Sequence, residues 1–205
     1  MPTPLHTAIN DTGGERAVHR ELESQPWVLK DLVLNCCNLC YVISHFTLGD
    51  EHEADFVVLH GFSGGWDIHF IELEPPSMSP FNAKGDFSSR MNHAAGQIRR
   101  WKQFQDRRDK GPYLVTQLRD AVVTKDLLWH DGREPTDSIG WPITCPESML
   151  IMHYHVLMGR RQHLNLELMV RKAAVQKTDG FELITYDRVL DVYERQCSDP
   201  SYTAD

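Results

Sequence analysis

Three carboxylates stand at the ends of neighbouring strand-like segments. Asp55 opens one apolar run, and Glu72 and Glu74 end the next. Because side chains alternate between the two faces of a strand, Glu72 and Glu74 point the same way. If Asp55 lies on the adjacent strand, the three acids converge, and their repulsion requires a bound proton or a bound cation. Carboxylate oxygens suit Mg²⁺ or Mn²⁺, so we expect a metal site at these residues.

A plainer interpretation is also open. Asp55 can be a turn residue that begins a strand, and Glu72 and Glu74 can lie on a solvated edge of the sheet. The spacing of the acids does not decide between the two interpretations. The decision depends on the elements that position them.

Hydrophobic periodicity predicts an α/β fold, with a mixed β-sheet flanked by helices. Proline at position 26 interrupts the first helical segment, because the residue before a proline disfavours the helical conformation. Short connections that contain glycine join the first three strands, which favours an antiparallel meander. The predicted helices span residues 15–34 (interrupted at 25–26), 87–104, 112–123, 164–174 and 186–196, and the predicted strands span 39–48, 55–59, 66–74, 149–158 and 181–185, with a loop over 129–146.

Composition restricts the class of protein. The 205 residues carry 21 Lys+Arg against 29 Asp+Glu, a formal net charge of −8, which disfavours a protein that coats nucleic acid by bulk charge. No stretch approaches the roughly 18 consecutive apolar residues of a membrane-spanning helix, and the first residues lack a secretory signal, so we expect a cytoplasmic protein. The length favours one domain over residues 15–197, with tails at 1–14 and 198–205.

The five cysteines favour reduced thiols over a disulfide framework, because the count is odd. Cys37 and Cys40 have the C-x-x-C spacing of a zinc ligand pair, which Cys145 can complete. Their apolar surroundings favour the alternative, in which free cysteines pack as small hydrophobic residues.

The order of the acids and the next helix is informative. Asp55 opens one strand, a hairpin leads to an apolar strand that ends in Glu72 and Glu74, and Gln97 lies on the inward face of the following helix. This order resembles the core of the PD-(D/E)XK nucleases.

Further motifs extend beyond this core. They are Leu22 together with residues 26–29; residues 72–76; Phe81; residues 85–86; residues 93–94; residues 97–98 together with Trp101; residues 159–161; and residues 184–188. Together they resemble the Shedu family of bacterial antiphage defence proteins, in particular its C-terminal nuclease domain, over residues 15–196. The resemblance implies a metal-dependent DNA endonuclease that assembles as a homo-oligomer, a dimer or a tetramer. It also implies that Asp55 and Glu72 bind the metal and that Gln97 is the helix glutamine beside the site.

Glu74 departs from the nuclease pattern, which has lysine at this position. Such a lysine orients or deprotonates the attacking water and stabilises charge on the phosphate. Two replacements are open. Lys84, in the loop after the third strand, can reach the site, or Glu74 can act as an extra ligand so that the metal activates the water. The plainer interpretation of Lys84 is an ordinary solvated loop residue.

Basic residues concentrate between residues 97 and 110, with a local excess of four positive charges. They are Arg99, Arg100, Lys102, Arg107, Arg108 and Lys110, against Asp106 and Asp109. A phosphate-binding patch and a solvated helix face are both open. The predicted DNA-binding residues are Arg99, Arg100, Lys102, Arg160 and Arg161, of which the last two can instead brace an oligomer interface.

Two further groups have structural and functional interpretations. His153 and His155 alternate along a strand and share a face, either as metal ligands or, as is more common, as hydrogen-bonded histidines. Residues 186–188 are expected to begin the last helix in a structural role.

We therefore expect a Shedu-like, metal-dependent DNA endonuclease. One alternative is a pseudonuclease that binds DNA or a protein partner, in which Glu74 in place of lysine has ended the chemistry. Another is an interaction protein that uses its sheet and oligomer surfaces and binds no nucleic acid.

Overall fold

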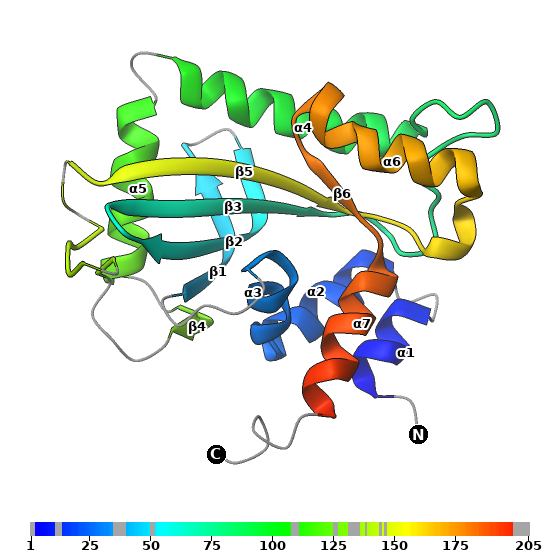
Figure 1. Ribbon diagram of the computed structural model, residues 1–205, viewed down its shortest axis with the longest axis horizontal. Coiled ribbons are helices and arrows are strands. Elements are labelled where there is room, and N and C mark those ends of the chain that lie inside the picture. The colour runs from blue at the N-terminus through cyan, green and yellow to red at the C-terminus, as the bar shows by residue number, and fades with distance from the viewer. Residues whose placement is uncertain are drawn as a thin grey trace.

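A six-stranded mixed sheet forms the centre of the protein, in the order β4-β1-β2-β3-β5-β6 (Figure 1). The computed structural model describes residues 3–10, 14–34, 40–49, 52–107, 111–124, 127–130, 136–137, 139–143, 145 and 147–198. The strands are β1 (Cys40–Leu48), β2 (His52–Phe62), β3 (Gly65–Leu73), β4 (Trp129–His130), β5 (Met149–Leu157) and β6 (Glu182–Ile184).

The pairing follows from the connections. β1, β2 and β3 form an antiparallel meander, and the short turn between β2 and β3 contains Gly64 at φ +88°, a conformation that favours glycine. β3, β5 and β6 run parallel. Parallel neighbours need a long crossover, and helices α4 (Ser89–Asp106) and α5 (Gly111–Thr124) lie in the one from β3 to β5.

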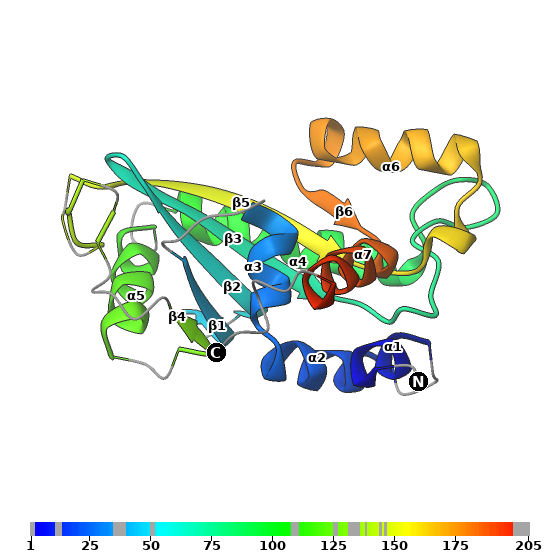
Figure 2. The same ribbon diagram turned by 60° about the horizontal axis from the view of Figure 1, so that its bottom comes forward.

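One face of the sheet is covered by helices from both ends of the chain (Figures 1 and 2). They are α1 (Pro4–Asn10), α2 (Gly14–Ser24), α3 (Trp27–Leu34) and α7 (Tyr186–Cys197). Phe56, Val58 and Ile71 point from the strands into this layer and are fully buried. The break between α2 and α3 falls at Gln25–Pro26, as the sequence predicted.

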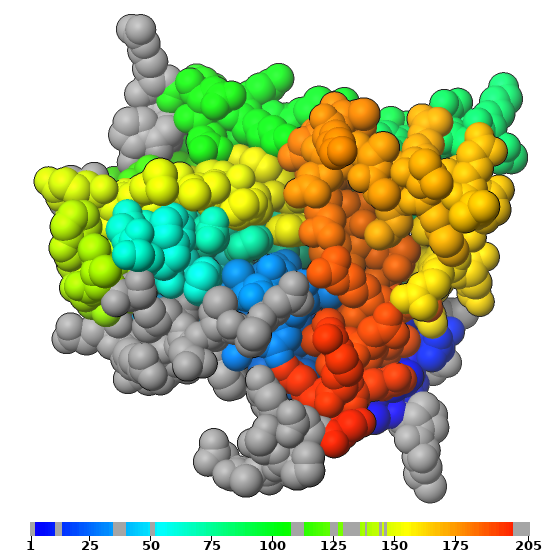
Figure 3. Space-filling model, in the orientation of Figure 1, coloured from blue at the N-terminus to red at the C-terminus, as the bar shows by residue number. Residues whose placement is uncertain are grey.

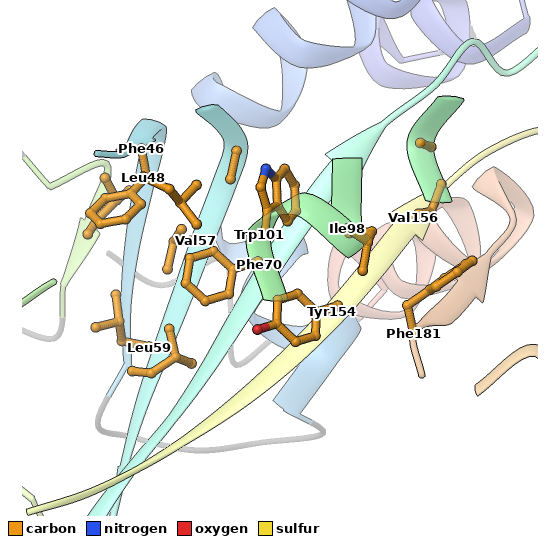
Figure 4. Packing of buried hydrophobic residues seen from close by; sticks show 14 of the residues in the cluster. Phe46, Leu48, Val57, Leu59, Phe70, Ile98, Trp101, Tyr154, Val156 and Phe181 are labelled. Carbon is orange, nitrogen blue, oxygen red and sulfur yellow. The ribbon is translucent and has the colours of Figure 1, made fainter. Parts of the chain in front are cut away.

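The opposite face packs against α4, α5 and α6 (Leu166–Asp179). Figure 4 shows Phe70 and Tyr154 of the sheet beside Trp101 and Ile98 of α4, and the rings of Phe70 and Trp101 lie 6.1 Å apart. Figure 3 shows the segment from α6 to α7, in orange and red, as a continuous surface beside β5. Alternation along the strands therefore supplies two separate apolar layers.

The predicted α/β fold, with a mixed sheet flanked by helices, is confirmed and is consistent with a PD-(D/E)XK-like core. Several details differ from the predicted elements. The strand predicted over 66–74 ends at Leu73, so Glu74 directly follows β3. β2 is longer than predicted, β4 forms within the predicted loop and pairs with β1, and α1 forms within the expected N-terminal tail. α1 has 7 residues, too few for a stable isolated helix, so its stability comes from burial of Leu5, Ala8 and Ile9.

No helix among the described residues combines the length and the apolar character needed to cross a membrane.

Candidate metal and active site

The structure places Asp55 and Glu72 side by side on β2 and β3. The antiparallel pairs of the two strands end with Phe56 opposite Ile71, and Asp55 and Glu72 are the next residues of those strands. The Asp55 carboxylate accepts a hydrogen bond of 2.7 Å from the backbone N–H of Leu73. This bond holds Asp55 against the end of β3, between the positions of Glu72 and Glu74.

Glu72 has the most strongly raised pKa of these acids. Its exposed fraction is 7%. Burial, followed by the charges of Asp55 and Glu74, raises its pKa to about 9, whereas a hydrogen bond from Gln97 acts in the opposite direction. Gln97 therefore lies beside the site, and Glu72 holds a proton at neutral pH unless positive charge is added.

Burial also raises the pKa values of the other two predicted acids. Glu74 is 2% exposed. Burial raises its pKa to about 7, against the lowering effect of Arg90. Burial raises the pKa of Asp55 to about 6, against the lowering effect of the Leu73 N–H. The three shifts have the direction expected for acids that share a space of low dielectric constant, and a cation among them would reverse that direction.

A fourth acid, Glu15, lies at the same site and was not predicted. It occupies the first turn of α2, and burial, followed by the charge of Asp55, raises its pKa. Its own charge raises the pKa values of Glu72 and Glu74. An acid in the first turn is common because it complements the helix dipole, so this signal in the sequence does not by itself indicate a site.

Arg90, also unpredicted, brings positive charge to the site. It lies in the first turn of α4, where Ser88 caps the helix by accepting a hydrogen bond from the backbone N–H of Met91. The Arg90 Nη1 atom is 3.7 Å from Glu74 Oε2. Because the Arg90 side chain is 56% exposed and that of Glu74 is 3% exposed, the guanidinium approaches the buried carboxylate from the solvent side.

Two buried oxygens fit the requirements of a bound cation. Among the described residues, Glu74 Oε2 and Gln97 Oε1 have no hydrogen-bond partner. Leaving a buried oxygen without a donor costs free energy, and a cation with oxygen ligands satisfies such atoms. Oxygen donors of this kind suit Mg²⁺ or Mn²⁺, and Asp55, Glu72 and Glu74 are the groups that would hold the ion. Among the described residues their oxygens do not all lie within 4.8 Å of one another, so a shared ion would have to draw the side chains together.

Lys84 occupies an exposed position in the loop before α4, where its backbone N–H donates a hydrogen bond of 2.8 Å to Asn82 Oδ1. Within the described part of the chain, the ion pair of Glu74 is with Arg90. A catalytic role for Lys84 stays a prediction.

The five predicted DNA-binding residues divide into two groups. Arg99 and Arg100 are exposed on α4. The other three are engaged within the protein. Lys102 Nζ donates to the carbonyl of Gly180 at 2.6 Å, and Arg160 and Arg161 pair with Asp187 and Asp191 of α7 at 3.1 and 2.9 Å. Arg108 and Lys110 lie outside the described residues.

His153 and His155 do share a face of β5, and both are hydrogen-bonded. His153 Nε2 is 2.8 Å from Asp67 Oδ1, and His155 Nε2 is 2.9 Å from His69 Nδ1. One ring nitrogen of each histidine is therefore hydrogen-bonded, whereas His155 Nδ1 has no hydrogen-bond partner among the described residues. Of the cysteines considered for zinc, Cys40 is buried, and Cys37 lies outside the described residues.

Tyr186 begins α7, as predicted, and supports the site from the opposite layer. It is fully buried, and its hydroxyl donates a hydrogen bond of 2.9 Å to the backbone carbonyl of Glu74. The contact fixes the backbone at the end of β3.

The raised pKa of Glu72 predicts a specific dependence of stability on pH. Below pH 4.5 the carboxyl is protonated in both states. As pH rises from 4.5 toward 9, the unfolded chain loses this proton first, so the free energy of unfolding decreases. Without divalent cations, Glu72→Gln, which cannot ionise, is expected to be more stable than the wild type at pH 8 by at least about 1 kcal/mol and to match it near pH 4. Urea denaturation at both pH values measures this difference, and an unchanged or lower stability at pH 8 contradicts it.

One known protein family matches most of the chain. The family model described as Shedu protein SduA, C-terminal, matches residues 13–190, which include all four acids and Arg90. Among curated proteins, no match is found. Membership in this family suggests a role in antiphage defence and nuclease chemistry. The chain belongs to the Shedu family, over the region that corresponds to the C-terminal part of SduA.

Proposed function

We propose that this protein is a DNA endonuclease that hydrolyses phosphodiester bonds with Mg²⁺ or Mn²⁺ held by Asp55, Glu72 and Glu74. The observation that carries the proposal is the burial of these carboxylates at one site, with raised pKa values. Such a site has a high affinity for a cation, because the cation removes the repulsion. When bound, a divalent metal ion lowers the pKa of the attacking water and neutralises charge on the phosphate.

The protein's own groups have separate tasks. The Leu73 N–H holds Asp55, Gln97 donates to Glu72, and Tyr186 fixes the backbone of Glu74. These contacts reduce the reorganisation that catalysis requires. Arg90 places a permanent positive charge next to Glu74, where the nuclease pattern has lysine. An arginine cannot act as a base, but it stabilises the negative charge that develops on the phosphate.

A second candidate function is a pseudonuclease that binds DNA or a protein partner without cutting DNA. Glu74 favours it, because a carboxylate cannot itself stabilise an anionic transition state. Assembly as a homo-oligomer is also part of the proposal. The exposed apolar residues of α6 offer a surface for it, namely Leu166, Met169 and Val170.

Cleavage of plasmid and linear DNA with and without Mg²⁺ or Mn²⁺ tests the proposal. We expect metal-dependent cutting by the wild type and a rate at least about 100-fold lower for Glu72→Ala, because the variant loses a metal-binding carboxylate. Glu167→Ala, an exposed acid on α6, is the matched control and should cut like the wild type. Absence of metal-dependent cutting, or equal cutting rates for the wild type and Glu72→Ala, would contradict the proposal that the protein is a metal-dependent endonuclease. If DNA binding persists without cutting, the pseudonuclease is favoured.

Arg90→Ala is expected to lower the cleavage rate by about 10- to 1,000-fold with little change in DNA affinity, because the lost charge acts mainly on the transition state. Arg90→Lys should recover part of the rate. Arg171→Ala removes a similar surface ion pair, 3.6 Å from Asp86, and should leave the rate unchanged. Single-turnover rates measure this effect. Equal rates for the wild type and Arg90→Ala would show that Arg90 has no part in the chemistry.

The double variant Arg99→Ala/Arg100→Ala is expected to weaken DNA binding and to reduce the slope of log K against log salt concentration by about 2, since each phosphate contact contributes about 0.9. Arg195→Ala, on α7, is the control. Fluorescence anisotropy over a range of salt concentrations gives both quantities. An unchanged slope places the DNA elsewhere on the protein.

A further inference from the structure

A second group of metal-ligand side chains lies on α2 and β1. It consists of His19, Glu23 and His45, and we refer to it as the His–Glu cluster. One ligand atom from each residue lies within 4.8 Å of the others. The cluster is separate from the acids Asp55, Glu72 and Glu74 and has different chemistry, with two imidazoles and one carboxylate.

Local structure brings the three side chains together. His19 and Glu23 are four residues apart on α2, so they lie on the same face of the helix. His45 lies on β1 and has φ +50°, a left-handed conformation that is rare for a residue other than glycine and is often found at functional sites. The rings of His19 and His45 lie 4.5 Å apart.

The distances between ligand atoms are near those of a metal site. Glu23 Oε2 is 3.7 Å from His19 Nδ1, and Glu23 Oε1 is 3.9 Å from His45 Nε2. Ligands at about 2.0–2.1 Å in a tetrahedral zinc site are roughly 3.3 Å from one another. Small rotations of His45, which is 57% exposed, and of Glu23 are enough to close this difference.

The surrounding contacts are those that orient metal ligands. Glu53 Oε1 is 2.7 Å from His45 Nδ1, which leaves Nε2 of the same ring directed at Glu23. The hydroxyl of Ser44 donates a hydrogen bond of 2.6 Å to Glu23 Oε1. A carboxylate on the far nitrogen of a ligating histidine, and a donor on a ligating carboxylate, are typical of the groups that surround a bound metal.

We propose that the His–Glu cluster binds a transition metal ion of the zinc class through His19, Glu23 and His45. Two imidazoles with one carboxylate suit Zn²⁺ better than Mg²⁺, which prefers oxygen ligands. The exposed side of His45 leaves room for water as a fourth ligand.

Such an ion would join α2 to the sheet. The same helix carries Glu15, and β2, which pairs with the strand β1 that carries His45, also carries Asp55. The ion would therefore fix Glu15 relative to Asp55 from a position outside the carboxylate site. Its role is structural, as a clamp on the helix.

Titration of the purified protein with Zn²⁺, and with Co²⁺ as a spectroscopic probe, tests this proposal. We expect one ion per chain at the His–Glu cluster, in addition to any ion held by the carboxylate site, a Co²⁺ absorption spectrum without thiolate bands, and a higher melting temperature with Zn²⁺. His45→Ala should weaken Zn²⁺ binding by more than tenfold, and Glu53→Ala by about 10- to 100-fold. Glu23→Gln provides a second ligand variant if His45→Ala changes the fold, as measured by circular dichroism.

Two controls separate this site from other sources of binding. His6→Ala removes a histidine that also contacts a glutamate, 2.9 Å from Glu194, and should not change Zn²⁺ affinity. Glu72→Ala should likewise retain the Co²⁺ spectrum, because the carboxylate site is separate. Equal Zn²⁺ affinity for the wild type, His45→Ala and Glu23→Gln overturns the proposal, as does failure of the folded wild type to bind either ion.

Discussion

Burial of several carboxylates at the end of β3, which raises their pKa values first by loss of water and then by mutual repulsion, is the constraint on which the rest of the site depends. Glu72 and Glu74 are almost inaccessible to water, and Asp55 and Glu15 act on them through their charges. Taking several acids out of water is unfavourable unless protons or cations compensate. Acids held in this arrangement lower the free energy of unfolding as pH rises toward neutrality, and a bound metal ion would raise it again. Both helix layers contribute residues to this site, since α2 brings Glu15 and α4 brings Gln97 and Arg90.

Glu74 stands where the nuclease pattern has a positively charged lysine. Positive charge is still present near the site, but it comes from another element. In this chain the cation comes from α4, through Arg90, instead of from β3. Arginine keeps its charge at any working pH, so it can stabilise a phosphate but cannot accept a proton from water. In the proposed reaction, activation of the water would depend on the metal ion, and the additional carboxylate at residue 74 would make the site more favourable for that ion. The net charge of −8 is compatible with a DNA partner, because acids gather at one site while Arg99 and Arg100 remain exposed on α4.

Much of the fold could be predicted from the sequence, because strand alternation and helical spacing report which faces are buried. The spacing of Met91, Ala94, Ile98 and Trp101 located α4 and its inward face. Alternation predicted that Glu72 and Glu74 share a face, and in the structure β3 ends at Leu73, with Glu74 directly after the strand. The hairpin and the hydrogen bond from the Leu73 N–H bring Asp55 of β2 to the same end of β3. Glu15, Arg90 and the His–Glu cluster could not be predicted in this way. They are brought together by the packing of α2 and α4 on the sheet, which no local pattern specifies. The same holds for α1 and β4, which are too short to show a periodicity.

The central claim is that Asp55, Glu72 and Glu74 share one divalent cation, and anomalous diffraction from a crystal soaked in Mn²⁺ tests it most directly. The proposed function predicts a strong anomalous peak within coordination distance of all three side chains, which would have to move toward one another to share the ion, and no peak there in crystals of Glu72→Ala. If the three side chains are well ordered in the crystal but no anomalous peak lies near them, the claim is contradicted. A peak that lies outside coordination distance of these oxygens would contradict it as well.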